Sequence, residues 1–275
     1  MEQALQQQKK NPVKVNDILD KTKIIANLAA APVLLIVLWQ SLSSAGVFIE
    51  VVLPSPVNVV KGILKISRDG TLLIDLKASG YRVLVGYFWG ALIGITLGFA
   101  SGLSKLVERF VSPLVDVMRQ IPMMAWIPLI ILWFGIGELS KYIIIGKSVF
   151  VPIFVNTLQG IRGVSNDYIE VAAVLEVPYF KRLFKVILPS AMPLIFTGLR
   201  LGAGFAWMAV VAAEMLAGLS GLGYGLLHAR DFLESDKLIG LMVVIGVLGF
   251  IIDRGILFTA NHLLRWRKGF SGEKK

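Results

Sequence analysis

Four ionisable side chains stand inside stretches that are otherwise apolar, and they have the clearest capacity for chemistry. They are Arg119, Lys147, Arg200 and Glu214. A charge at the centre of a lipid bilayer costs on the order of 3 kcal/mol, so such residues usually face a water-filled path or a charged partner. Cations on such a path could bind an anion, and a carboxyl group could carry a proton. Structural roles are equally open: Arg119 can pair with Asp116 three residues earlier, and Arg200 could extend toward the membrane surface.

Other kinds of chemistry find no support in the sequence. The chain has no cysteine, and its two histidines, His228 and His262, are far apart, so we expect no metal site and no cofactor. The triplet Gly146-Lys147-Ser148 is similar to the end of a phosphate-binding loop, but Lys141 stands where that loop needs its first glycine. We therefore expect no nucleotide site and no catalytic residues, and we interpret the chain as not being an enzyme.

The elements that must position the four ionisable residues are long apolar segments. Hydrophobic residues make up 56% of the chain and charged residues 17%, whereas soluble proteins average about 25% charged residues. Three uncharged runs are each long enough to cross a bilayer, and three further runs reach that length if a few charges are tolerated inside them. The sequence therefore predicts an all-α membrane protein with about six transmembrane helices, over 24–49, 83–104, 120–137, 142–161, 189–213 and 238–264.

The basic residues indicate how this domain is oriented. We divide the chain into a cytoplasmic N-terminal segment (1–23), a transmembrane domain (24–264) and a cytoplasmic C-terminal tail (265–275). With this topology the cytoplasmic segments hold 16 basic residues and the external segments seven. Because Lys and Arg accumulate in cytoplasmic loops, both termini are predicted to be cytoplasmic. The net charge of +10 is thereby accounted for without nucleic-acid binding.

Small residues and prolines predict how the spans pack. Glycines recur every four residues along the second span, and we interpret this stripe as a close contact with another helix of the bundle, with a dimer or substrate surface as the alternative. Pro122 and Pro128 interrupt the third span and would free backbone carbonyls around a cavity, with Trp126 nearby. After Pro56, a short amphipathic helix suited to the membrane surface is predicted. The glycines of the stripe are Gly86, Gly90, Gly94, Gly98 and Gly102.

The segment 161–189 is too polar to span a membrane and is patterned as two short helices. Asp167 can cap the first helix, with Glu170 three residues on in a capping-box arrangement. The break falls at Val177-Pro178, because proline restricts the residue before it and can begin a helix. In the second helix four apolar residues share one face, which needs either the bilayer or a partner protein to cover it: Phe180, Leu183, Phe184 and Ile187.

This segment resembles the EAA loop of ATP-binding-cassette importer permeases. The resemblance lies in Glu170-Val171-Ala172 followed, after the expected gap, by Val186-Ile187-Leu188-Pro189. In that family the loop forms coupling helices that dock in a cleft of the cytoplasmic ATPase. One departure is that Glu176 stands where the family has a glycine. The resemblance implies that the coupling residues are Glu170, Ala172, Ala173, Glu176, Phe184, Leu188 and Pro189.

Similar motifs continue from about residue 30 to 264, and within that family the chain resembles permeases for alkanesulfonates, taurine, nitrate and bicarbonate. The resemblance implies a binding-protein-dependent permease fold in a bacterial inner membrane and import of a small oxyanion. The implied partners are two cytoplasmic ATPase subunits, an extracytoplasmic substrate-binding protein, a second copy of the chain and membrane lipid, but no nucleic acid. The residues expected on the translocation path are Arg119, Trp126, Arg200 and Glu214.

Two alternatives remain open from the sequence. A related permease could carry a neutral heterocycle such as a vitamin precursor, since the binding protein selects the solute. An ion-coupled secondary transporter could instead use Glu214 or Asp253 as a proton site. That alternative has less support, because secondary transporters often contain inverted repeats with broken helices in both halves, and 161–189 has no counterpart in the first half.

Overall fold

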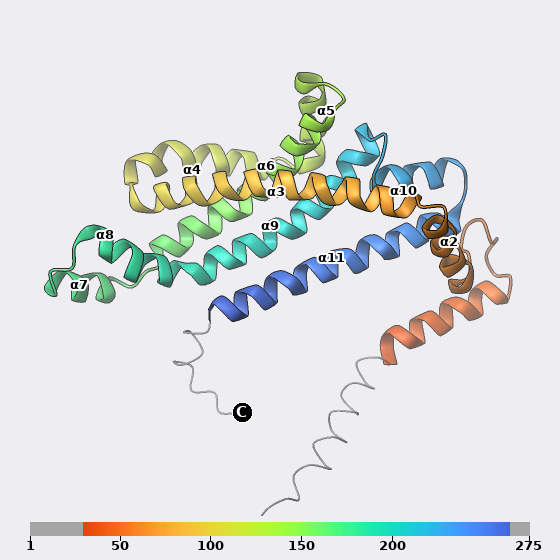
Figure 1. Cartoon of the computed structure of the whole chain (residues 1–275), viewed down its shortest axis with the longest axis horizontal. Helices are drawn as coiled ribbons and strands as arrows, with labels where there is room; N and C mark the ends of the chain where they lie inside the picture. The colour runs from red at the N-terminus through yellow and green to blue at the C-terminus, as the bar shows by residue number, and fades with distance from the viewer. Residues whose placement is uncertain (1–29, 265–275) are drawn as a thin grey trace, which may run out of the picture.

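The computed structural model describes residues 30–264, which are mostly helical and contain no strand. Figure 1 shows the long helices lying side by side, with α7 and α8 at one end of the molecule and α2 and α10 at the other. After a helix over Ala30–Ser44, the elements are α2 (Pro56–Arg68), α3 (Thr71–Leu103), α4 (Lys105–Gln120), α5 (Met123–Phe134), α6 (Glu138–Arg162), α7 (Asn166–Val174), α8 (Tyr179–Arg182), the π-helical η1 (Leu183–Ile187), α9 (Leu188–Ala217), α10 (Leu222–Asp231) and α11 (Ser235–Leu263).

Four helical segments of the described chain are long and apolar enough to cross a membrane: α3, α6, α11 and the run Tyr179–Ala217. The bent pair α4–α5 makes a fifth if it counts as one span. The apolar helix Ala30–Ser44 is shorter, and the start of the predicted run 24–49 lies outside the described residues. The prediction of an all-α membrane protein with about six spanning segments is thus confirmed.

The third predicted span, over 120–137, is not one straight helix. It breaks between α4 and α5, whose axes differ by 105°. Pro122 forces Ile121 out of the helical region, and Ile121 accordingly has an extended conformation (φ −85°, ψ 117°). The 12 residues of α5 extend only about 18 Å, which is too short to cross a hydrocarbon core of about 30 Å. Pro122, which was expected to bend the span, divides it instead, whereas Pro128 lies inside α5.

Two other boundaries differ from the prediction. The second span begins at Thr71 rather than near residue 83, because polar residues in its first turns find partners inside the protein. The helix predicted after Pro56 is α2, capped by the Ser55 side chain, which accepts a hydrogen bond from the backbone N–H of Asn58 (3.2 Å). Its Val59 and Ile66 are buried and α2 packs against α11, so part of its apolar face covers the bundle rather than the membrane surface.

The core is built around α6, which lies between α3 and α9. The glycine stripe of α3 faces α6, and each glycine meets the α6 residue 59 positions later in the chain. This constant offset means that the two helices run parallel in one register. A Cβ atom on Gly90 would lie 2.5 Å from the carbonyl oxygen of Gly146, closer than atoms can approach. The stripe is therefore a helix contact within the bundle, which confirms the first interpretation. The pairs are Gly86–Ile145, Gly90–Val149, Gly94–Ile153, Gly98–Thr157 and Gly102–Ile161.

The other side of α6 packs against α9 in the same manner. Gly198 and Gly202 of α9 face Ile153, and Gly160 of α6 faces Ala191. Ile144, Ile145, Val149, Ile153 and Phe154 of α6 are almost completely buried as a result. In lipid, where burial of apolar side chains gains little, close backbone approach of this kind is what holds helices together.

We expect Gly90→Ala to destabilise the protein by about 1–3 kcal/mol, since an added methyl group would meet backbone that cannot move aside. The matched control is Gly80→Ala on the same helix, where an added Cβ meets nothing within 4 Å. Alanine favours a helix over glycine by about 1 kcal/mol, so this control should be at least as stable as the wild type. Thermal unfolding in the same detergent gives the melting temperatures of both variants. Equal melting temperatures would contradict the packing argument.

Candidate functional site

The first helix of the segment 161–189 begins earlier than predicted. Ser165 caps α7, and its hydroxyl accepts a hydrogen bond from the backbone N–H of Asp167 (3.3 Å). Asp167 is therefore the second residue of the helix and not its cap. Glu170, the fifth residue, has an exposed side chain and takes no part in a capping box. The carboxylate of Glu170 therefore does not help to cap α7.

The helix α7 ends in a turn that normally requires glycine. The N–H of Glu176 donates to the carbonyl of Ala173 (2.9 Å), and the N–H of Val177 donates to the carbonyl of Ala172 (2.9 Å). These two bonds define a Schellman motif, whose C′ residue adopts a left-handed conformation. Glu176 occupies that position with φ 50°. The chain thus makes a glycine-type turn with a glutamate, and Pro178 then begins α8.

The four apolar residues predicted to share one face of the second helix are divided between two environments. Leu183 and Ile187 are buried against Ile161 and Ala191, whereas Phe180 and Phe184 are exposed. At 100° per residue the four positions cover an arc of about 100°. The bundle covers the half of this arc that holds Leu183 and Ile187, and the other half faces outward.

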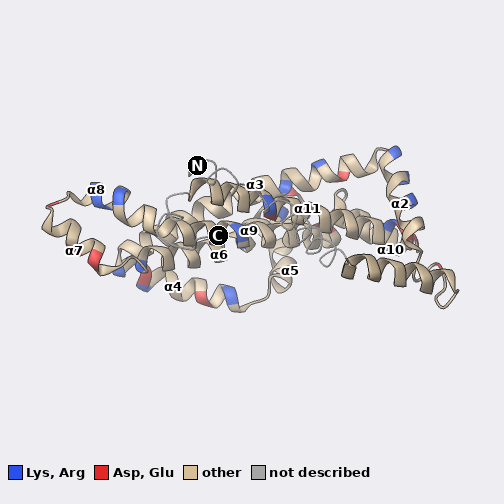
Figure 2. Ribbon diagram, turned by 90° about the horizontal axis from the view of Figure 1, so that it is seen from below, with Lys and Arg blue, Asp and Glu red and all other residues tan. Residues whose placement is uncertain are grey.

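An exposed apolar surface results at the tip of the molecule, and we name it the α7–α8 patch. Val174 is 82% exposed and Phe180 is 73% exposed. Basic side chains on α8 and η1 border it, and Figure 2 shows acidic residues on α7 and basic residues on α8. Exposed apolar surface of this extent marks a site of protein or membrane contact. The patch comprises Tyr168, Val171, Val174, Leu175, Tyr179, Phe180 and Phe184.

The other residues predicted in the loop lie around this patch. Ala173 and Glu176 are exposed, Ala172 is buried, and Leu188 and Pro189 are half-buried. The second helix does not end before Pro189, because the chain continues from Tyr179 to Ala217 as one helix of 39 residues. A π-helical turn precedes Pro189, with Leu188 N–H donating to the carbonyl of Leu183. This helix extends about 58 Å and connects the α7–α8 patch to the opposite end of the bundle.

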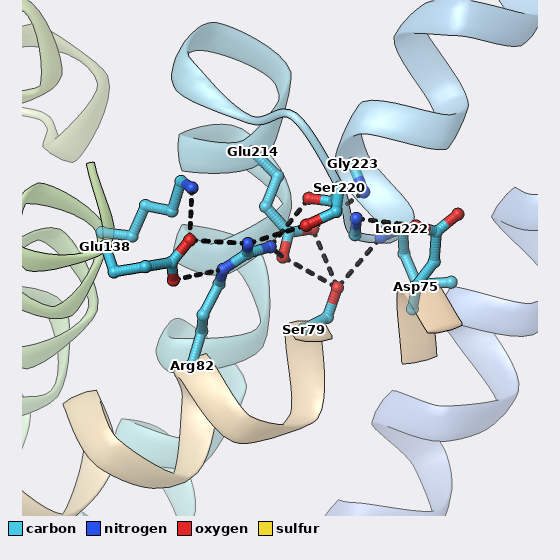
Figure 3. Close-up of polar contacts among 10 residues, drawn as sticks. Asp75, Ser79, Arg82, Glu138, Glu214, Ser220, Leu222 and Gly223 are labelled. Carbon is cyan, nitrogen blue, oxygen red and sulfur yellow. Dashed lines mark hydrogen bonds and ion pairs between the residues drawn. The ribbon is translucent and has the colours of Figure 1, made fainter. Parts of the chain in front are cut away.

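At that opposite end, a polar network buries the side chain of Arg82 (Figure 3). Its Nε and Nη2 donate to the two carboxylate oxygens of Glu138, both at 2.8 Å. Its Nη1 donates to Glu214 (2.7 Å) and to the carbonyl oxygen of Ser220 (2.7 Å), and Nη2 also donates to the Ser220 hydroxyl (2.9 Å). All five N–H groups of the guanidinium are thus used, which is the maximum that an arginine can offer.

Glu214 is completely buried in the same network. Its carboxylate accepts hydrogen bonds from Arg82, from the Ser79 hydroxyl (2.8 Å) and from the backbone N–H of Gly223 (3.0 Å). Gly221 (φ 109°) allows the turn before α10 to pass over this carboxylate, since a Cβ there would lie 2.3 Å from it. Glu214 was predicted on a translocation path, but here it fastens α9 and α10 to α3 and does not face a water-filled groove.

The network was missed from the sequence, although α3 carries a signal of it. Asp75, Ser79 and Arg82 are spaced i, i+4 and i+7, so they share one face of a helix. Asp75 accepts a hydrogen bond from the N–H of Gly221 (2.8 Å), and Ser79 accepts one from the N–H of Leu222 (2.9 Å). A polar face at the start of an apolar helix therefore indicated a buried partner.

The other predicted path residues line grooves along α4, α5, α6 and α9. Trp126 and Lys147 border a mainly apolar groove of about 540 Å³. Lys147 also borders a second groove of about 440 Å³, together with Arg119. Arg119 pairs with Asp116 at 3.5 Å, the partner predicted for it, and the ammonium of Lys147 lies 4.5 Å from the centre of the Trp126 ring. The fold thus brings together Arg119 and Trp126, both expected on the path, with Lys147, which the sequence singles out only as a charge inside an apolar stretch.

Arg200 lies in a third groove of about 410 Å³. Its Nε and Nη2 donate to the carboxylate of Asp253 at 2.5 and 2.8 Å, which joins α9 to α11. Phe205 borders both this groove and the one that contains Arg119. Arg200 therefore has a partner on the neighbouring helix and does not extend alone toward the membrane surface.

Comparison with known proteins decides the family. Residues 90–260 match the family described as binding-protein-dependent transport system inner membrane component. The chain belongs to this family. A Bacillus subtilis protein named as an aliphatic sulfonates transport permease, SsuC, is 37% identical over 88% of this chain and 87% of its own length. The taurine permease TauC of Escherichia coli is 34% identical over 84% and 86%, and the nitrate permease NrtB of Synechocystis is 35% identical over 92% and 93%.

A solved structure of the methionine transporter MetNI, facing inward, resembles the fold with a TM-score of 0.62. It is 17% identical and covers 72% of this chain and 97% of its own chain. The family resemblance predicted from the sequence is confirmed. This permease is an inner-membrane component of an ATP-binding-cassette importer, a transporter and not an enzyme. The alternative of an ion-coupled secondary transporter is wrong, and its two suggested proton sites are ion-paired with Arg82 and Arg200.

We expect Arg82→Gln to destabilise the permease by about 3–5 kcal/mol, because it leaves the buried carboxylate of Glu214 without its cation. The control is Arg230→Gln, which removes an exposed pair with Asp231 and should cost less than about 1 kcal/mol. Chemical unfolding of the purified permease compares the two. A small effect of Arg82→Gln would show that the network is not a structural anchor.

Proposed function

We propose that this permease, as a pair of identical copies with two cytoplasmic ATPase subunits, imports a small oxyanion delivered by an external binding protein. Relatives named for sulfonates, taurine and nitrate support this class of solute. The observation that carries the proposal is the row of cations along the grooves of α4, α6 and α9. Arg119, Lys147 and Arg200 line these three grooves. Asp253 is the one acidic residue among their lining residues. A positive lining lowers the energy of an anion at bilayer depth.

In the proposed arrangement the α7–α8 patch faces the cytoplasm and docks on an ATPase subunit, with both termini on the same side. The patch offers aromatic and aliphatic side chains beside an exposed carboxylate at Glu170 and basic residues on α8. Aromatic residues at the centre with charges at the rim are the composition that protein interfaces favour. Because Tyr179–Ala217 is one helix, a displacement of the patch moves α9 and its Arg200 directly.

The solute class is tested with the permease, its ATPase and its binding protein reconstituted together in liposomes. We expect ATP-dependent uptake of a labelled alkanesulfonate or of nitrate, and competition between unlabelled oxyanions. A neutral pyrimidine serves as the control solute and should neither enter nor compete. Uptake of the neutral compound without competition from either oxyanion would replace this proposal with the heterocycle alternative.

We expect Glu170→Gln to lower substrate-stimulated ATP hydrolysis at least tenfold, since losing one partner of a buried interfacial charge pair costs about 2–5 kcal/mol. Glu170 has no capping task, so this substitution removes a charge and little else.

The matched control is Glu176→Gly, which removes the same negative charge from the same loop. A glycine removes the cost of a left-handed side-chain residue, roughly 1–2 kcal/mol, and should leave hydrolysis unchanged while raising the melting temperature. The reverse order of effects on hydrolysis would contradict docking through Glu170.

A further inference from the structure

The two grooves that contain Lys147 have opposite characters and meet at this residue. The larger one is lined by aromatic and aliphatic side chains, with Trp89, Trp126, Trp133 and Tyr142 among them. The smaller one adds Arg119, Ser148 and Asn156, and no acidic residue lines it. Met118 and Lys147 border both grooves. A charged region and an aromatic region are thus adjacent, with the Lys147 ammonium between them.

Lys147 is held in place without a carboxylate. None of the ion pairs among residues 30–264 includes it. Its ammonium lies over the Trp126 ring and donates one long hydrogen bond to the carbonyl oxygen of Met118 (3.4 Å). That carbonyl is available because Pro122, four residues later, has no N–H to offer it. An ammonium has three N–H groups, so two remain for a ligand.

The depth of Lys147 indicates what kind of ligand this is. Lys147 is the tenth residue of α6, which places it about 14 Å from the external end of that helix. A lipid headgroup lies at the level of the helix ends, beyond the reach of this ammonium. A cation at such depth is unfavourable unless it faces water or an anion. The ligand is therefore an anion that enters the membrane domain, which is what a transported solute does.

We propose that the junction of the two grooves is a binding site for an organic sulfonate with a short apolar tail. The sulfonate oxygens accept hydrogen bonds from Lys147 and from the N–H groups of Arg119 that Asp116 leaves free. The tail lies on the aromatic groove beside Trp126 and Trp133. This inference rests on the proposed oxyanion import and narrows it, because an inorganic anion such as nitrate would leave the aromatic groove unused. Grooves of about 540 and 440 Å³ are large enough for such a molecule.

The experiment uses the reconstituted transporter with its ATPase and binding protein, and it follows uptake of butanesulfonate and methanesulfonate. Lys147→Met keeps a side chain that packs on Trp126 but removes the charge, and we expect at least a tenfold loss of uptake of both sulfonates. Lys147→Arg should restore most of it. Lys65→Met, at an exposed lysine in the last turn of α2, is the matched control and should transport normally. Unstimulated ATP hydrolysis reports whether each variant is assembled.

The tail is tested separately with Trp133→Ala, which removes aromatic surface from the larger groove alone. We expect it to lower the ratio of butanesulfonate to methanesulfonate uptake several-fold. This ratio does not depend on how much protein folds, so a loss of expression cannot imitate the effect.

The possible outcomes separate this inference from the proposed function. If the wild-type transporter imports no oxyanion, the proposed function fails and the inference fails with it. If the wild type imports sulfonates and an assembled Lys147→Met variant imports them equally, only the inference is overturned. An unchanged ratio in Trp133→Ala overturns the assignment of the tail. Retention of anionic phospholipid by wild type but not by Lys147→Met, with uptake unchanged, would assign the site to lipid and overturn the transport role.

Discussion

The close contact between α3 and α6 is the constraint on which the remaining structure depends. Five glycines of α3 meet α6 at a constant separation in the chain, so a shift of one residue would break every contact at once. This register fixes the positions of three charged residues on α6. Glu138 at its start reaches Arg82, Lys147 near its middle lies at the grooves, and Arg162 at its end pairs with Glu108 of α4. A helix held only by side-chain packing in lipid would not be so narrowly placed.

The helix Tyr179–Ala217 connects the three regions that the importer needs. Its first residues form part of the α7–α8 patch, its middle carries Arg200, and its end holds Glu214 in the Arg82 network. The two ends differ in how they are held. Glu214 is fixed by three hydrogen-bond donors, whereas Phe180 and Phe184 are exposed. A force applied to the exposed residues near Tyr179 therefore acts on a helix whose other end is fixed by the Arg82 network.

The sequence predicted those features that depend on local pattern or on composition. The long apolar runs, the glycine stripe and the two helices of 161–189 follow from spacing alone, and the fold contains all three. The break at Pro122 was underestimated, because a proline in an apolar run is compatible with either a bend or a division of the helix. Ser165 and Asp167 are equally suitable caps by residue type, and only the backbone path selects Ser165.

Pairings between distant residues were beyond reach from the sequence. No local pattern identifies the partners of Arg82, which lie 56 and 132 residues away. Arg200 and Asp253 are separated by 53 residues, and both had been noticed as charges that a span must tolerate. A pattern along one helix shows that a polar face exists, but the identity of its partner depends on which helices become neighbours.

The separation of Arg82 from its partners also has a consequence for biogenesis. During synthesis the ribosome adds about 5–20 residues per second, so Glu214 follows Arg82, 132 residues earlier, after an interval of roughly 7–26 s. Glu138, only 56 residues later, arrives well before it. Of the two acidic partners of Arg82, Glu138 is therefore synthesised first, and the network is complete only after Glu214 and the turn before α10 have followed.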